Sequence, residues 1–139
     1  MKLGPRFKAL LLWTSAILYM SGLAVWLLAS SRFQVQGEYG PEPSPLKPWF
    51  LHAHSIAGLL FLVLFGYLWR DHVEPGLKRS KKKRSGLTLV AALAVLFATV
   101  PMLFYLTGDS ARAWTAAVHT WLGAILLAPF LFHLRSKNA

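Results

Sequence analysis

Long apolar runs alternate with short polar segments along the chain. The runs without Asp, Glu, Lys or Arg are Ala9–Ser31, Pro48–Trp69, Ser85–Gly108 and Ala113–Leu134. Each exceeds the roughly 20 apolar residues that a helix needs to span a bilayer. The runs show no polar alternation and are about twice as long as a transmembrane β-strand, so we expect helices and not a β-barrel.

These runs predict an all-α protein with a single domain over residues 1–139. The transmembrane helices are expected at about 9–31, 48–70, 85–107 and 112–134. Short connections make neighbouring helices antiparallel, which predicts a membrane-embedded, up-down four-helix bundle.

The first run could instead be the apolar core of a cleaved signal peptide, because Lys2, Arg6 and Lys8 precede it. Its length argues against this alternative, since a signal core has only about 7–15 apolar residues. We therefore expect this run to be retained as a helix.

The basic residues predict the orientation of the helices. Twelve of the 15 Lys and Arg residues fall in the N-terminal segment, the second connection and the C-terminal tail. Because cytoplasmic loops are enriched in Lys and Arg, we expect both termini on the cytoplasmic side. The basic run Lys78–Arg84 could suggest nucleic-acid binding, but its place between two spans favours contact with anionic lipid. We expect a lipid partner and no nucleic acid.

Composition narrows the chemistry that the chain can perform. Hydrophobic residues make up 55% of the sequence, and no cysteine is present. The absence of cysteine excludes disulfides, thiolate metal sites and cysteine nucleophiles. Only five Asp and Glu residues occur, none of them within a long apolar run, which argues against paired-carboxylate catalysis. The five histidines remain as the main candidates.

Four of the histidines form two pairs along the chain. His54 and His72 belong to the second run and its inner end, whereas His119 and His133 belong to the fourth run. At 3.6 residues per turn, the members of each pair lie close to one stripe of their helix. If the stripes face each other, His54 meets His119 near the outer face and His72 meets His133 near the inner face. His52 points away from His54 and is expected to be a bystander.

Two imidazoles from facing helices suit the axial positions of a haem, whereas zinc prefers three or four protein ligands. Copper remains an alternative. Gly58 and Gly123 each follow a histidine by four residues, on the same helix face, and would leave room for a flat macrocycle. The helical rise from His54 to His72 exceeds the rise from His119 to His133 by about 6 Å. We expect the resulting strain to fall on His72.

Arg112 is a candidate partner for a haem propionate, because guanidinium groups pair well with carboxylates. The alternative is a loop arginine beside Asp109.

Further short motifs accompany the histidines from about Gly37 to Arg135. They are Gly37-Glu38, Gly40-Pro41, Trp49, Gly66, His72-Val73, Arg84-Ser85-Gly86, Tyr105, Asp109, Trp114 and Pro129. In these features the chain resembles the small four-helix cytochrome-b-like membrane proteins of bacteria, several of which are known only as a domain of unknown function. The resemblance implies b-type haem between the second and fourth helices and electron transfer with quinone or a partner protein.

The leading hypothesis is a di-haem b-type cytochrome of the bacterial inner membrane. It would be an electron-transfer subunit rather than a self-sufficient enzyme, working with a quinone, a periplasmic redox protein or a larger complex. One alternative is a structural or assembly subunit whose histidines serve helix packing. Another is a proton or metal carrier with a histidine relay, which the lack of acidic residues within the spans disfavours.

Overall fold

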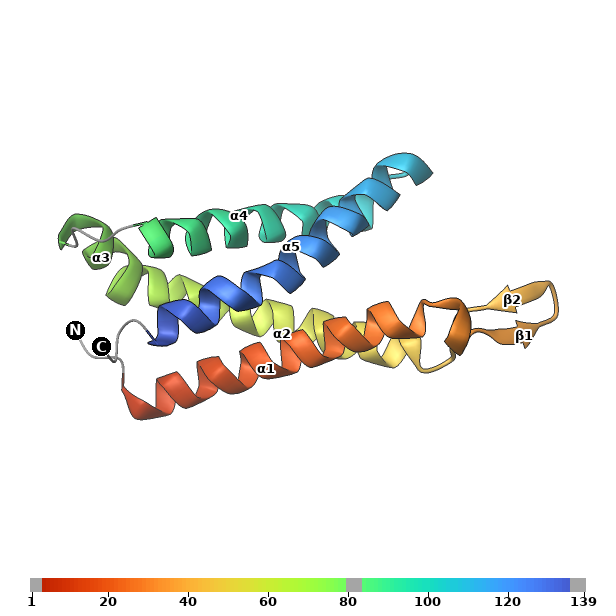
Figure 1. Cartoon of the computed structure of the whole chain (residues 1–139), viewed down its shortest axis with the longest axis horizontal. Coiled ribbons are helices and arrows are strands. Elements are labelled where there is room, and N and C mark those ends of the chain that lie inside the picture. The colour runs from red at the N-terminus through yellow and green to blue at the C-terminus, as the bar shows by residue number, and fades with distance from the viewer. Residues whose placement is uncertain (1–3, 80–83, 136–139) are drawn as a thin grey trace. The chain divides into compact units, whose positions relative to one another are not determined.

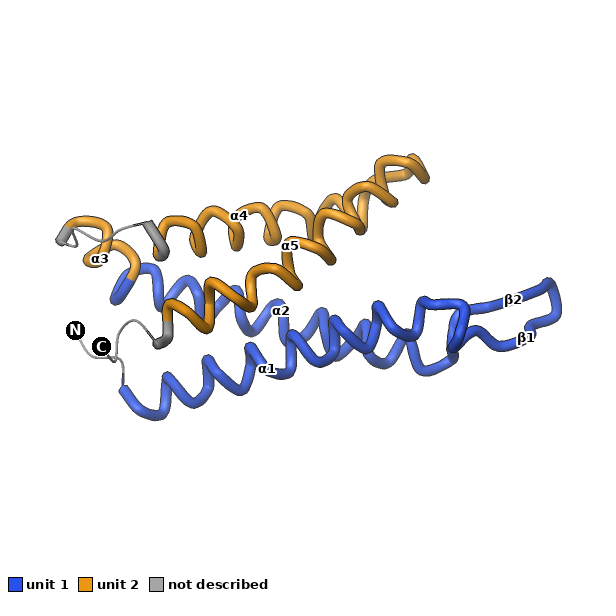
Figure 2. The backbone as a smooth tube through the Cα atoms, viewed as in Figure 1, with its two compact units in different colours: residues 1–72 blue, residues 73–139 orange. Residues whose placement is uncertain are grey.

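The computed structural model describes residues 4–79 and 84–135. The chain divides into two compact units, residues 1–72 and residues 73–139 (Figure 2). We describe each unit by itself.

Unit 1 is a hairpin of two long helices, α1 (Pro5–Leu28) and α2 (Lys47–Leu68), which pack side by side and run antiparallel (Figure 1). Both helices have a proline in their first turn, where the missing N–H would have no intrahelical acceptor. Helix α1 gives way to a short 3-10 turn at Ser31–Phe33. The first predicted helix, 9–31, is therefore confirmed with its bounds moved toward the N-terminus.

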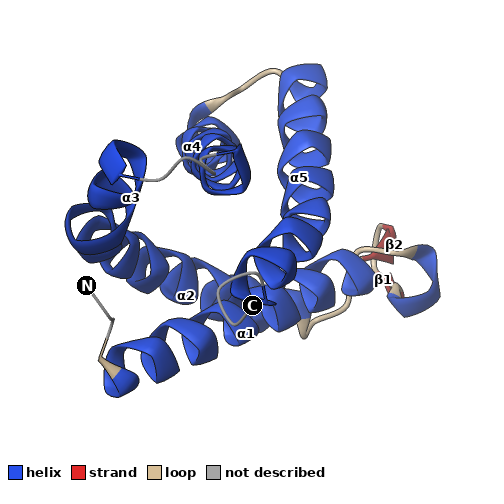
Figure 3. Cartoon of the chain, turned by 60° about the vertical axis from the view of Figure 1, so that its left-hand side comes forward, coloured by secondary structure: helices blue, strands red, loops and turns tan. Residues whose placement is uncertain are grey.

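The connection between α1 and α2 contains a small β-hairpin that the hydrophobic pattern does not predict. Strands β1 (Val35–Gly37) and β2 (Gly40–Glu42) pair antiparallel and extend beyond the helix ends (Figures 1 and 3). The strands are joined by a two-residue turn, after which Gly40 adopts a φ of 121°. Such a φ is accessible to glycine at little cost, so Gly40 allows the tight reversal of the chain.

The chain does not leave the helical conformation at the end of α2. It continues as a π-helix over Trp69–Val73 and then as α3 (Glu74–Arg79). Lys78 and Glu74 form an exposed ion pair of 2.6 Å on α3. The sequence placed a loop here, with His72 just past a helix end. That expectation is corrected, because His72 lies within the π-helix.

Unit 2 contains a second long hairpin, α4 (Arg84–Tyr105) and α5 (Asp109–Arg135), joined by only three residues (Figure 3). Helix α5 begins with Asp109, whose negative charge favours a helix N-terminus. The predicted start near residue 112 is thus too late, and Arg112 lies in the first turn of α5 and not in a loop. Both helices contain an internal proline, Pro101 and Pro129.

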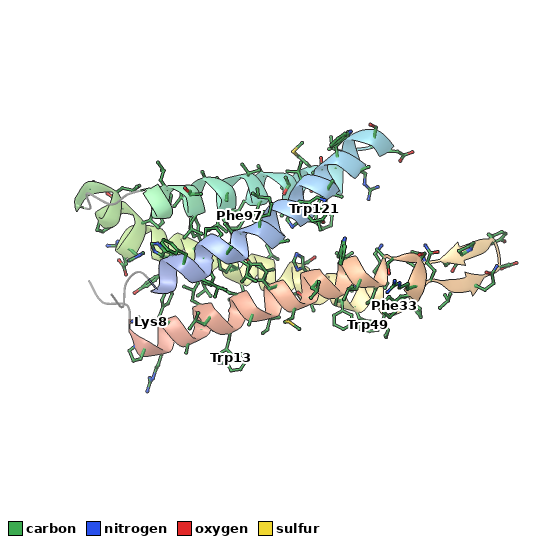
Figure 4. The ribbon with its side chains drawn as sticks, in the orientation of Figure 1. Lys8, Trp13, Phe33, Trp49, Phe97 and Trp121 are labelled. Carbon is green, nitrogen blue, oxygen red and sulfur yellow. The ribbon has the colours of Figure 1, made fainter. Side chains whose placement is uncertain are left out.

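Most of the buried side chains carry a small hydroxyl group, whereas many large apolar side chains are exposed. Thr14, Ser15 and Ser21 of α1 and Thr99 of α4 are at most 6% exposed. The side chains of Trp13 and Trp49, by contrast, are more than 70% exposed and extend away from their helices (Figure 4). This distribution is typical of helices that pack in lipid, where small residues allow close approach.

The structure confirms that the protein is helical and that four helices are long and apolar enough to cross a membrane. The orientation of the spans and the side on which the termini lie remain predictions.

Cysteine labelling tests the predicted orientation, and the cysteine-free chain gives no background signal. Tyr39, at the tip of the β-hairpin, is 91% exposed, and the side chain of Lys78 on α3 is 73% exposed. In intact spheroplasts, a membrane-impermeant maleimide should label Tyr39→Cys directly and Lys78→Cys only after the membrane is opened. Equal labelling of the two variants before opening would contradict the predicted topology.

Candidate functional site

In unit 1, α1 holds the imidazole of His54. Nδ1 of His54 lies 3.0 Å from the backbone oxygen of Leu18 and 3.2 Å from Oγ of Ser21. The Ser21 hydroxyl itself donates to the backbone oxygen of Ile17, at 2.7 Å. These contacts tie the half-buried histidine of α2 to the middle of α1.

Gly22 provides the surface on which this imidazole rests. A Cβ atom added at Gly22 would lie 2.9 Å from Cε1 and 3.2 Å from Nδ1 of His54. Real Cβ atoms do not approach so closely, and the bond to Leu18 restricts the ring from moving away. Gly22 is therefore part of the site, although the sequence analysis did not select it. The signal that could have found it is the Ser21-Gly22 pair within an otherwise apolar run.

In unit 2, His119 of α5 has a closely similar arrangement with α4. Its Nδ1 lies 2.6 Å from Oγ1 of Thr99, which is buried. The Thr99 hydroxyl donates to the backbone oxygen of Leu96, also at 2.6 Å. Thr99 was not selected from the sequence either, although it is a hydroxyl residue within an apolar run, as Ser21 is.

The hydrogen bonds indicate the tautomer of both histidines. A backbone oxygen only accepts, so Nδ1 of His54 must be the donor to Leu18. Both contacts of Thr99 are satisfied together when its hydroxyl donates to Leu96 and its oxygen accepts from Nδ1 of His119. A neutral imidazole with its proton on Nδ1 carries its lone pair on Nε2. Both side chains are thus in the form that coordinates a metal through Nε2.

The two glycines that follow these histidines lie against the first helix of their own hairpin. A Cβ added at Gly58 would lie 3.8 Å from Cδ1 of Leu18, and one added at Gly123 would lie 4.0 Å from Cδ2 of Leu96. Both distances are ordinary van der Waals contacts. The glycines therefore border a leucine of the neighbouring helix, and their proposed place beside a macrocycle stays a prediction.

The remaining candidates lie at the ends of their helices. His72 is half-buried in the π-helix, and His133 is half-buried near the end of α5. Arg112 is exposed in the first turn of α5, and His52 is exposed on α2. A π-turn uses i→i+5 hydrogen bonds, so the regular α-helical spacing that placed His72 on the stripe of His54 does not extend through it.

Each predicted histidine pair joins one residue of unit 1 to one residue of unit 2, so both pairings stay predictions. Within residues 4–79 and 84–135, no group of three or more His, Cys, Asp or Glu side chains could hold a metal ion.

Comparison of the chain with protein-family models, with curated proteins and with solved structures found no match.

The contact between Gly22 and His54 predicts a loss of stability in Gly22→Ala. The added methyl group must displace a hydrogen-bonded ring, and such overpacking costs about 1–3 kcal/mol. Gly66→Ala on α2 is the matched control, because a Cβ there meets no described atom within 4 Å. Thermal unfolding in detergent should show a lower Tm for Gly22→Ala and an unchanged or higher Tm for Gly66→Ala. Equal shifts would contradict the close approach of His54 to α1.

Proposed function

We propose that this protein is a b-type cytochrome that carries electrons across or within the bacterial inner membrane. His54 of α2 and His119 of α5 would be the axial ligands of one haem, near the outer face. His72 and His133 would be the ligands of a second haem, near the inner face. The chain would serve as a subunit or partner of a redox system that includes a quinone or a periplasmic redox protein.

The observation that supports the proposal most strongly is the common state of His54 and His119. Each donates from Nδ1 to an oxygen of the preceding helix. Histidines that bind metals almost always donate their second ring N–H to a carboxylate, a backbone carbonyl or a water molecule, which fixes the ring and its tautomer. The residues present therefore fit axial coordination of haem. A haem with two imidazole ligands supplies a one-electron couple when bound.

The remaining residues would orient the group and keep water away. The apolar runs around His54 and His119, Pro48–Trp69 and Ala113–Leu134, contain no acidic residue, so they place no acid–base group beside either histidine along its own helix. Arg112 lies two helical turns before His119 on the same face of α5, about 10 Å toward the start of the helix. Its exposed guanidinium could pair with a carboxylate at the membrane surface.

The π-helix affects the position of His72 in the proposed inner pair of His72 and His133. The rise from His54 to His72, taken as regular α-helix, is about 6 Å greater than the rise from His119 to His133. A π-turn contains more residues per turn than an α-turn, so the chain advances less along the axis over Trp69–Val73. The π-helix thus lies at His72, the residue at which strain was expected, and it also ends the regular spacing that put His72 on the stripe of His54.

A structural or assembly subunit is the second candidate. The bonds from His54 to Leu18 and from His119 to Thr99 join two helices in each unit, as polar contacts do in membrane proteins in general. This candidate predicts a colourless protein that tolerates replacement of either histidine.

Absorption spectroscopy distinguishes the two candidates. Protein purified from cells with haem available should show the bands of reduced haem b, and a pyridine haemochrome assay should give its haem content. His119→Ala should remove one haem per chain, because one axial ligand of the outer site is lost. His52→Ala is the matched control, since His52 is exposed and lies only two residues from His54.

A colourless wild-type preparation would reject the cytochrome proposal. An unchanged haem content in His119→Ala, with helicity verified by circular dichroism, would reject the assignment of His119. A loss in His52→Ala equal to that in His54→Ala would reject the choice of His54 over its neighbour.

A further inference from the structure

The two hairpins repeat one arrangement of side chains. In each hairpin, the first helix contains a leucine followed three residues later by a hydroxyl residue, Leu18 and Ser21 in α1 and Leu96 and Thr99 in α4. The second helix contains a histidine followed four residues later by a glycine. In both units the hydroxyl oxygen contacts Nδ1 of the histidine, and a Cβ added at the glycine would reach van der Waals distance of the leucine.

Helix packing alone does not require the hydroxyl groups to meet histidines. Ser15 is as buried as Ser21 and donates to the backbone oxygen of Leu11 in its own helix, at 2.7 Å. Thr115 likewise donates to the backbone oxygen of Ala111, at 2.8 Å. These two buried hydroxyls are therefore satisfied within their own helices. Ser21 and Thr99 have the same kind of bond and in addition contact a histidine.

The two contacts differ in strength. Thr99 accepts from His119 at 2.6 Å while its own proton is donated to Leu96, so the two hydrogen bonds form a chain. Hydrogen bonds in such chains polarise and strengthen one another. His54 donates to the Leu18 carbonyl at 3.0 Å, and the Ser21 oxygen lies farther away, at 3.2 Å. Thr99 is thus the main acceptor for His119, whereas Ser21 supplements a backbone acceptor for His54.

We propose that Ser21 and Thr99 are positioning residues that direct Nε2 of His54 and His119 toward a metal, and that Thr99 also tunes the electron donation from His119. The proposal rests on the function proposed above. An acceptor at Nδ1–H increases the electron density of the ring and makes Nε2 a stronger donor. A stronger donor stabilises the oxidised metal, so the Thr99 hydroxyl should lower the reduction potential of the outer haem.

The first test needs no haem. Nitrogen-15 NMR of histidine-labelled, haem-free protein reports which ring nitrogen carries the proton. In the wild-type protein, His54 and His119 should both be protonated on Nδ1. Thr99→Val removes the hydroxyl at nearly constant volume and should shift His119 toward the Nε2–H form, and Thr99→Ser should restore it. An unchanged tautomer in Thr99→Val would overturn the positioning role of Thr99.

The second test measures the midpoint potential of the haem-loaded protein. Thr99→Val should raise the potential of one haem, Thr99→Ser should return it toward the wild-type value, and Ser15→Ala should leave both haems unchanged. Equal potentials in Thr99→Val and wild-type protein would overturn the tuning role. If Thr99→Val does not fold, Thr99→Ala removes the same hydroxyl and takes its place, and an unchanged potential in that variant overturns the tuning role.

The two tests separate this inference from the proposed function. A protein that never binds haem rejects the cytochrome, while the NMR measurement still decides whether the hydroxyls fix the tautomers. If the protein binds haem but the histidine tautomers and the midpoint potentials do not change when Thr99 and Ser21 are replaced, the cytochrome proposal stands and the positioning role is rejected.

Discussion

The hydrogen bond from a histidine Nδ1 to the preceding helix is the interaction on which the rest of the site depends. An imidazole within an apolar span loses its bonds to water, and an unsatisfied N–H group in such surroundings costs several kcal/mol. His54 and His119 avoid this cost because their Nδ1–H groups donate to Leu18 and Thr99. Each bond requires the two helices of a hairpin to approach closely, and small residues make that approach possible. Within each hairpin, the histidine, the hydroxyl residue and the small residues therefore depend on one another.

This requirement also explains why small hydroxyl residues are buried in the units beside apolar ones such as Leu64 and Leu126. Ser21 and Thr99 are buried, whereas most tryptophans are exposed. In water the reverse distribution would be expected, because burial of large apolar side chains drives folding. In lipid that driving force is absent between helices, so van der Waals contact and interhelical hydrogen bonds provide the stability. The same arrangement that stabilises each hairpin also fixes the orientation of its histidine ring.

The sequence predicted the long helices well because the length and apolarity of a span are properties of one segment. The observed helix bounds differ by a few residues from the predicted ones where local chemistry acts. Helix α5, for example, begins at Asp109, before the apolar run, because a carboxylate favours a helix N-terminus. The π-helix at His72 and the β-hairpin after α1 were not predicted, since both depend on backbone geometry that hydropathy does not encode. Gly22 and Thr99 were missed for another reason. Their role appears only when it is known which face of one helix meets which residue of the next.

The hydroxyl residue and the histidine are separated by different lengths of chain in the two hairpins. Ser21 and His54 are 33 residues apart, whereas Thr99 and His119 are only 20 residues apart. The additional chain in unit 1 contains the β-hairpin, which extends beyond the helix ends and leaves the pairing of α1 with α2 in register (Figure 1). Connection length therefore does not determine where the contact forms. In both hairpins the contact lies in the half of the helices nearer to the connection.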